Sequence, residues 1–262
     1  MKWKSFIGVV LTISVLAAYL VVSTGFADIK QQSIKCKEMR ITVCDSLINN
    51  FTSPADIKTD IKHILTSERI KTVDEQMYRI NTNEMIQLLN KRSVLKNTVV
   101  YTSIDGILHI DVYQRRPIIC VQRPNSTFYI DESGYIFPLP NAQTMDMPLI
   151  TGAISMNIPA GFRGEIPKNE TFLQQAYRLA LYLDGNDFWL AQVARLEVAN
   201  ENNVRVIPCA GKHLIDMGSL DNFQYKFKKL LAFYAKVCQA DDSTYQRIDL
   251  RYGNQIVCTK RK

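Results

Sequence analysis

The sequence predicts an α+β protein with a single hydrophobic helix at its amino end, followed by two small domains that mix helices and strands. An uncharged run covers residues 6–26, and after it helical stripes of apolar residues alternate with short stretches of period-two hydrophobicity. Hydrophobic residues make up 47% of the chain and charged residues 22%, a balance that supports packed cores. We expect four segments: a cytoplasmic tail at 1–5, a transmembrane helix at 6–26, a βααββ domain at 28–116, and an α+β domain with a mainly antiparallel sheet at 117–262.

The amino-terminal run has the length of a membrane-spanning helix. Its 21 residues would extend about 30 Å, whereas the apolar part of a cleaved signal peptide usually has about 7–15 residues. An uncleaved anchor is therefore preferred to a signal peptide cut after Ala27. The basic residues that follow the run oppose export, but Lys2 and Lys4 precede it as in a signal sequence, and the short tail leaves no room for a folded domain. We expect the carboxyl side to be exported.

A strand and a helix open the first domain. The strand is predicted within residues 34–44, where three apolar residues alternate with polar ones: Met39, Ile41 and Val43. Ser53, Pro54 and Asp56 then provide a cap, a first-turn proline and a first-turn acid, which together predict a helix start. The helix has one apolar stripe, formed by Ile57, Ile61, Ile64 and Leu65.

A second helix and a hairpin complete this domain. Asn81 and Glu84 predict another helix start, and the apolar side of that helix consists of Met85, Ile86, Leu88 and Leu89. Strands are predicted at 98–104 and 107–113 around the turn Asp105-Gly106, with Leu108, Ile110 and Val112 facing inward.

The second domain is predicted to combine short strands with two helices. Strands at 128–130 and 135–137 flank a turn at 131–134, and further strands are predicted at 192–199, 204–208 and 213–217. The helices are expected at 171–183 and from residue 223, the latter with the stripe Phe223, Phe227, Leu230, Leu231 and Tyr234. Its lysines, interpreted as a solvated outer side, are Lys226, Lys228, Lys229 and Lys236.

The run from Arg247 to Cys258 allows two interpretations. A two-residue turn at Gly253-Asn254 would place Arg251 opposite Ile256 and Asp249 opposite Cys258, which mixes charged with apolar groups on one face. A single long strand instead separates Ile248, Leu250, Tyr252, Ile256 and Cys258 from the charged residues. We prefer one long strand, lying at a sheet edge.

The residues indicate no catalytic or metal site. None of the three histidines, at 63, 109 and 213, has a second His or Cys at a metal-ligand spacing, and no phosphate loop or nucleophile motif occurs. We therefore predict no enzyme, no cofactor and no metal. Without Lys2 and Lys4, the soluble part has a modest net charge of about +5 (30 − 25), which argues against nucleic-acid binding. Cys36 and Cys44 would lie about 26 Å apart in one strand, while a bond between Cys209 and Cys258 stays open.

The order of these segments resembles the bacterial cell-division family FtsQ/DivIB. The resemblance is carried by the strand–helix–helix–hairpin module with the run 51–57 (FTSPADI), which looks like a POTRA domain, and by the run 110–118 (IDVYQRRPI), which is similar to the family's Arg/Glu-x-x-Pro crossover. Asp131 with Gly134 looks like the family's Asp-x-x-Gly turn, and the run 245–252 (YQRIDLRY) is close to its final strand.

The resemblance implies a non-catalytic, single-pass protein of the cell inner membrane whose periplasmic part organises the septal division complex. It further implies that the last strand receives a strand from an FtsB-like protein acting with an FtsL-like one. The partner-binding residues expected on that basis are Arg247, Asp249, Arg251, Tyr252, Gly253, Asn254, Gln255 and Ile256. The alternative is a POTRA-containing protein of envelope biogenesis or secretion that handles exported polypeptides.

Overall fold

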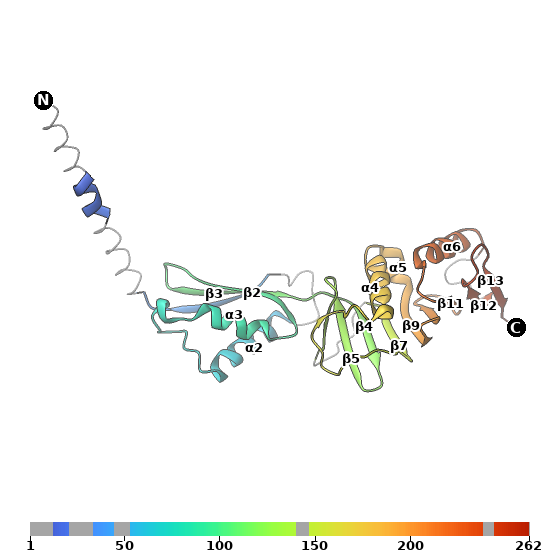
Figure 1. Ribbon diagram of the computed structural model, residues 1–262, viewed down its shortest axis with the longest axis horizontal. Coiled ribbons are helices and arrows are strands. Elements are labelled where there is room, and N and C mark those ends of the chain that lie inside the picture. The colour runs from blue at the N-terminus through green and yellow to red at the C-terminus, as the bar shows by residue number, and fades with distance from the viewer. Residues whose placement is uncertain (1–12, 21–33, 45–52, 140–146, 238–243, 262) are drawn as a thin grey trace, which may run out of the picture. The chain divides into compact units, whose positions relative to one another are not determined.

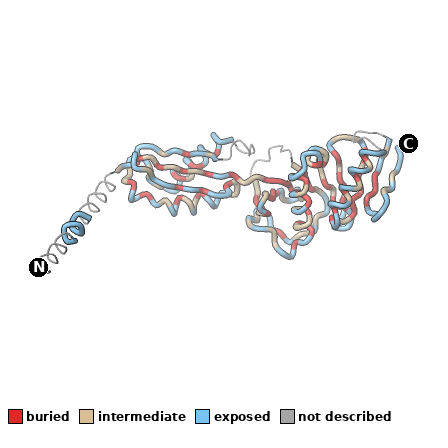
Figure 2. The backbone as a smooth tube through the Cα atoms, turned by 90° about the horizontal axis from the view of Figure 1, so that it is seen from above, coloured by how far each residue is buried: buried red, intermediate tan, exposed pale blue. Residues whose placement is uncertain are grey.

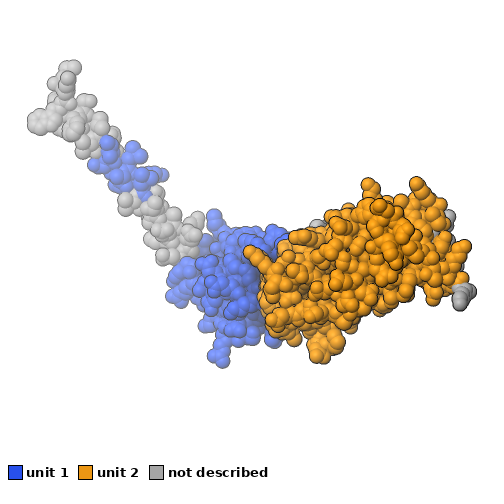
Figure 3. All heavy atoms as spheres, turned by 45° about the vertical axis from the view of Figure 1, so that its right-hand side comes forward, with its two compact units in different colours: residues 1–114 blue, residues 115–262 orange. Residues whose placement is uncertain are grey.

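The computed structural model describes residues 13–20, 34–44, 53–139, 147–237 and 244–261. The chain forms two compact units, Met1–Gln114 and Arg115–Lys262 (Figure 3). The boundary between the domains was predicted after residue 116. Residues 13–20 of the predicted span are helical and exposed, and the rest of that span lies outside the described residues. Within the described ranges, no helix combines the length and apolarity needed to cross a membrane.

Unit 1 has the predicted order of strand, helix, helix, strand, strand. Its elements are β1 (Glu38–Val43), α2 (Pro54–Ser67), the short 3₁₀ helix η1 (Met77–Arg79), α3 (Thr82–Asn90), β2 (Leu95–Thr102) and β3 (Ile107–Gln114). The strands form a three-stranded sheet in the order β1-β3-β2, with β1 parallel and β2 antiparallel to β3. Helices α2 and α3 cover one face of this sheet (Figure 1).

The helix starts and the core of unit 1 follow from the residues that predicted them. Ser53 Oγ accepts from the Ala55 amide at 3.1 Å, and Asn81 Oδ1 accepts from the Glu84 amide at 3.1 Å. These caps satisfy amides that have no partner within the helix. Three inward side chains of β3 are fully buried in the core of this unit: Leu108, Ile110 and Val112, each at 0% exposure.

The hairpin turn differs from the predicted two-residue form. Ser103 N donates to Ile107 O at 3.0 Å, so the strands close around the three residues 104–106 rather than around Asp105-Gly106 alone. Gly106 has φ +88°, and a Cβ there would lie 2.8 Å from Lys35 O. A three-residue loop with its last residue in the left-handed region therefore requires glycine at this position.

Unit 2 is built on one large sheet. Its strands are β4 (Pro117–Arg123), β5 (Ser126–Asp131), β6 (Tyr135–Phe137), β7 (Leu149–Gly152), β8 (Gly164–Glu165), β9 (Val193–Asn200), β10 (Asn203–Pro208), β11 (Leu214–Gly218), β12 (Tyr245–Asp249) and β13 (Val257–Lys260). They form a ten-stranded sheet in the order β13-β12-β11-β10-β9-β7-β4-β5-β6-β8. Parallel pairing joins β12 to β11, β9 to β7 and β7 to β4, and the other described neighbours are antiparallel. The sheet is mainly antiparallel, as predicted.

The helices of unit 2 are α4 (Thr171–Asp184), α5 (Asp187–Gln192) and α6 (Phe223–Lys236). They lie on the same side of the sheet (Figure 1) and bury one continuous apolar core there. In α6, Phe223, Phe227, Leu230 and Tyr234 are buried as predicted, but Leu231 is 45% exposed. The prediction for Leu231 is wrong. Each residue of a helix is rotated by about 100° from the one before it, so Leu231 points away from the buried face on which Leu230 lies.

The turn that opens unit 2 is held by ion pairs. Asp131 is fully buried, and its carboxylate accepts from the Arg115 guanidinium at 2.7 Å and from the Ser133 and Tyr135 amides. Arg116 donates to both carboxylate oxygens of Asp184 at 2.7 Å, which ties the first residues of the unit to the end of α4. The two arginines of the Arg-Arg-Pro crossover therefore have structural roles, because they bind the carboxylates of Asp131 and Asp184.

Candidate partner-binding surface

Strand β12 lies inside the sheet, not at its edge. It runs parallel to β11, with Arg247 beside Leu214 and Asp249 beside Asp216, and the Leu250 amide continues this pairing by donating to Asp216 O at 2.9 Å. Ile248 and Leu250 are 0% and 1% exposed, because the period-two pattern turns both toward α6. The opposite side of β12 carries its charged residues.

The carboxyl-terminal run is a hairpin, and the prediction of one long strand is wrong. After Leu250 the chain reverses through residues 250–256 and returns as β13, antiparallel to β12, with Ile248 opposite Cys258 and Asp249 opposite Val257. Strand β13 is consequently the edge of the sheet. We call residues 250–256 the C-terminal loop.

Side chains from β12 and α6 stabilise the start of the reversal. Asp249 Oδ1 accepts from the Arg251 amide at 3.0 Å, a side-chain-to-backbone bond typical of a turn, and its carboxylate also pairs with the Arg251 guanidinium. The Arg251 stem packs over Gly218 at the end of β11, where a Cβ would lie 2.9 Å from Arg251 Cγ. These contacts turn the chain away from a straight strand.

Lys229 of α6 holds the C-terminal loop. Its Nζ donates to the carbonyl oxygens of Leu250, Tyr252 and Gln255, at 3.3, 2.5 and 3.4 Å. Burial lowers the pKa of this ammonium group, and the nearby Asp249 acts in the opposite direction. The interpretation of Lys229 as a solvated residue is therefore wrong, and Lys226 likewise donates to Ser219 O at 2.8 Å.

An ion-pair ladder crosses the charged face beside this loop. Asp216 of β11 lies between Arg205 Nε of β10 at 3.1 Å and Arg247 Nε of β12 at 2.9 Å. Asp216 is buried, whereas the Arg247 and Arg251 side chains are 47% and 50% exposed. The Arg251 hydrogen bond lowers the pKa of the Asp249 carboxyl, and Asp249 in turn raises the pKa of the guanidinium. The face therefore offers exposed guanidinium groups held in place by carboxylates.

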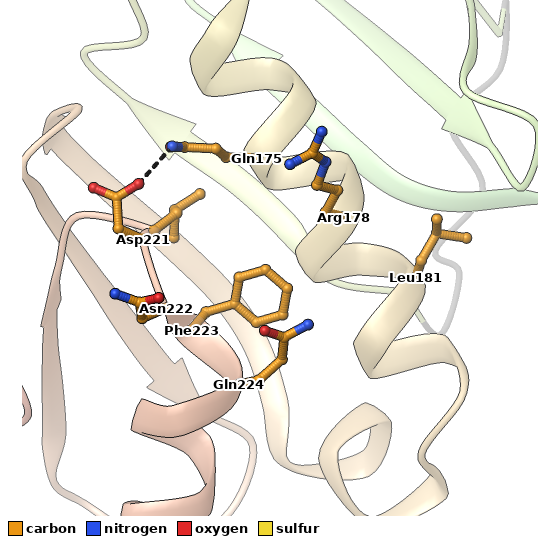
Figure 4. A pocket seen from close by; sticks show the side chains of 8 residues that line it. Gln175, Arg178, Leu181, Asp221, Asn222, Phe223 and Gln224 are labelled. Atoms are coloured by element: carbon orange, nitrogen blue, oxygen red, sulfur yellow. Dashed lines mark hydrogen bonds between the residues drawn. The ribbon is translucent and has the colours of Figure 1, made fainter.

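Other parts of the described chain offer little for chemistry. A groove of about 390 Å³ lies between α4 and the start of α6, but Gln175 Nε2 donates to Asp221 Oδ1 at 2.8 Å across it, so these polar groups satisfy each other (Figure 4). Burial raises the pKa of the Cys120 thiol to about 11, which keeps it protonated and unreactive at neutral pH. Among described residues, no group of His, Cys, Asp and Glu is suited to hold a metal ion.

Comparison with known proteins identifies the family of this chain. The family model FtsQ/DivIB, C-terminal related, matches residues 116–259, more than half of the chain. The chain belongs to the FtsQ/DivIB family. A POTRA-like domain model matches residues 34–113, so unit 1 has the predicted POTRA-like fold.

A curated relative agrees with this assignment. The chain is 26% identical over 163 residues to the cell division protein FtsQ of Salinibacter ruber (strain DSM 13855 / M31). The match covers 60% of this chain and 60% of the relative. The resemblance seen in the sequence is thus confirmed at the level of the family.

In this FtsQ/DivIB-family chain, the predicted partner-binding residues fall in two structural settings. Arg247 and Asp249 belong to β12, whereas Arg251, Tyr252, Gly253, Asn254, Gln255 and Ile256 lie in the C-terminal loop. Tyr252 is 47% exposed, and a Cβ added at Gly253 would meet nothing within 4 Å. Ile256 instead packs partly against the large core.

Two features of this surface were not predicted: β13 as a separate edge strand, and Lys229 as the residue that holds the loop. The signal for the strand was available, because Val257-Cys258-Thr259 is a short β-prone run after Gly253. The role of Lys229 had no local signal, since its three acceptors lie 21 or more positions away along the chain.

Proposed function

We propose that this protein is a non-catalytic, membrane-anchored scaffold of the bacterial division complex, which captures an FtsB-like protein, together with its FtsL-like companion, by strand addition in the periplasm. Membership of the FtsQ/DivIB family and the relative named as a cell division protein support the setting. The partner and the mode of capture are our inference from the carboxyl-terminal end of the sheet in unit 2.

The proposed anchor is the uncharged run 6–26, with residues 1–5 in the cytoplasm and both folded units in the periplasm. Its length supports this placement, because 21 uncharged residues match the thickness of a bilayer. Tethering would confine the scaffold and its partners to one surface, so that individually weak contacts suffice for assembly.

The observation that carries the proposal is the open carboxyl-terminal end of the ten-stranded sheet. Strand β13 lies at that edge, and beside it the C-terminal loop presents Tyr252, while β12 and the loop present Arg247 and Arg251. An added strand gains main-chain hydrogen bonds from such an edge, and exposed side chains next to it provide selectivity. The opposite edge is β8, which has only two residues and offers a much shorter ladder.

The test is a binding measurement with the full chain in lipid nanodiscs and the periplasmic segment of the FtsB-like protein encoded in the same genome. Tyr252→Glu places a charge on the proposed surface and should weaken binding roughly tenfold or more, as expected for an interface aromatic. Tyr78→Glu is the matched control, because Tyr78 is also exposed, at 56%, but lies in unit 1.

Both variants should keep the wild-type circular dichroism. Equal affinity of the Tyr252→Glu variant and the wild type would refute the placement of the partner at this end of the sheet. Equal loss in both tyrosine variants would show that the effect is not specific to it.

A further inference from the structure

The carboxyl-terminal hairpin is buried at the end of β12 and mostly exposed along β13 (Figure 2). Ile248, Asp249 and Leu250 are 0%, 6% and 1% exposed, whereas Val257 in β13 is 44% exposed, and Gln246 and Arg247 at the start of β12 are also exposed. Thr259 and Lys260 are also exposed, and Cys258 alone in β13 packs partly against the core. Apolar burial is the main source of stability, so β13 is held far less firmly than the strand it covers.

The remaining attachments of β13 are polar and lie near its ends. The Arg261 amide donates to Thr244 O at 3.0 Å, and its guanidinium donates to Lys212 O at 2.6 Å. The ladder between β12 and β13 is interrupted by a register shift between Tyr245 and Arg247. Lys229 bonds to carbonyls of the C-terminal loop, none of which belongs to β13. The strand can therefore leave β12 while Leu250 O stays bonded to Lys229.

We propose that β13 is a replaceable strand, which covers the edge of β12 in the free protein and is displaced when a partner strand binds there. This inference rests on the proposed capture of a strand at this end of the sheet, and it specifies that the partner pairs with β12 in place of β13 rather than with the outer edge of β13. The occupant is an extended segment of the partner that runs antiparallel to β12, as β13 does, and repeats its ladder.

The side chains at the edge of β12 indicate which residues the partner segment should carry. At the position opposite Ile248 the chain itself provides only the small, half-buried Cys258. A partner with a valine, leucine or isoleucine there would bury more apolar surface, and that difference favours exchange. If Lys229 then releases Tyr252 O and Gln255 O, residues 251–256 can extend β12, on the face pattern in which Ile248, Leu250 and Tyr252 share one side.

If β13 covers the edge of β12, it lowers the apparent affinity for the partner strand. The apparent affinity falls in proportion to the fraction of molecules in which β13 has opened. Deleting residues 257–262 in the full chain removes the competitor and should tighten partner binding roughly tenfold or more. If the partner instead extends the sheet from β13, the same deletion abolishes binding and overturns the inference.

A reversible lock gives the matched control. Residues directly opposite each other in an antiparallel pair have Cα atoms about 4.5–5.5 Å apart, within the range of about 4.4–6.8 Å found in disulfides. Ile248→Cys therefore places a thiol opposite the native Cys258. The oxidised variant, with its bond verified by mass spectrometry, should bind the FtsB-like segment at least tenfold more weakly than the same protein after reduction. Ile248→Cys with Cys258→Ser should show no effect of oxidation, and equal binding of the locked and reduced forms would overturn the inference.

A partner-independent measurement separates this inference from the proposed function. Amide hydrogen exchange of the wild-type chain in nanodiscs should be on the order of a hundredfold faster at residues 257–260 than at 246–249. Equal protection of the two strands would overturn the inference whatever binds. Fast exchange at β13 without binding of the FtsB-like segment would instead refute the proposed partner and leave the replaceable strand in place.

Discussion

Replacing Lys229 by methionine tests how the C-terminal loop is held. Methionine keeps an unbranched chain of similar length but removes the ammonium group that donates to the carbonyls of Leu250, Tyr252 and Gln255. Lys228→Met is the matched control, because Lys228 is the next residue on α6 and is exposed. The two variants change the same charge by the same amount at neighbouring positions.

The expected loss follows from the three hydrogen bonds. A bond to a charged group contributes about 1.5–3 kcal/mol, but the two contacts at 3.3 and 3.4 Å are long and the loop is exposed, so the set contributes roughly 2 kcal/mol. Removing the ammonium group also removes the cost of burying it, which the lowered pKa of Lys229 reflects. We therefore expect a net loss of about 1–2 kcal/mol, which for a domain of this size lowers Tm by roughly 2–8 °C.

Thermal unfolding followed by circular dichroism gives the global effect, and amide exchange across 250–260 gives the local one. Lys229→Met should raise exchange in this segment roughly tenfold for each 1.4 kcal/mol lost, whereas Lys228→Met should leave Tm and exchange unchanged. Indistinguishable profiles for the two variants would refute the assignment of Lys229 as the residue that holds the loop.

Two further predictions concern ion pairs. The hydrogen bond from Arg251 holds the pKa of Asp249 below its ordinary value of 3.8, so this carboxylate stabilises the fold above pH 3.8 and loses that effect as pH falls through the lower folded pKa. The difference in unfolding free energy between wild type and Asp249→Asn should thus be constant above about pH 5 and shrink below pH 3.8; a difference independent of pH would contradict this. Arg116→Ala removes the two-point bond to Asp184 and the bond to Glu132, and should cost about 2 kcal/mol in urea unfolding. Arg178→Ala, at an exposed residue of α4, the helix that carries Asp184, should cost under about 0.5 kcal/mol.

Most of the fold was predictable because its signals are local. The starts of α2 and α3 depend on capping residues within four positions, and the stripes of α2 and α6 follow from the helical period. Helix α5 was missed since it has only six residues, too few for a period to show, although Asn186 caps it by accepting from the Trp189 amide. Short elements held mainly by tertiary contacts leave little trace in the sequence.

The candidate site was only partly predictable because it depends on the length of one turn. The rejected hairpin at Gly253-Asn254 pairs Asp249 with Cys258 and so mixes charged with apolar residues, and that objection was sound. Shifting the register by one residue, with Gly253 at the centre of a longer loop, pairs Ile248 with Cys258 on the core face and leaves Asp249 opposite the exposed Val257. The longer loop depends on Lys229, which no local pattern connects to it.

The same parity explains why the burial pattern does not distinguish the hairpin from the long strand, and why the chain can change between them. Ile248 and Cys258 are ten positions apart, an even number, so they share a face in a continuous strand and also lie on the same face as opposite partners in the hairpin. A partner strand that displaces β13 therefore lets β12 lengthen without moving Ile248 or Leu250 from the core. The exchange alters residues 251–260, of which only Ile256 and Cys258 are partly buried, and this confines its cost to the part of the sheet that contributes least to stability.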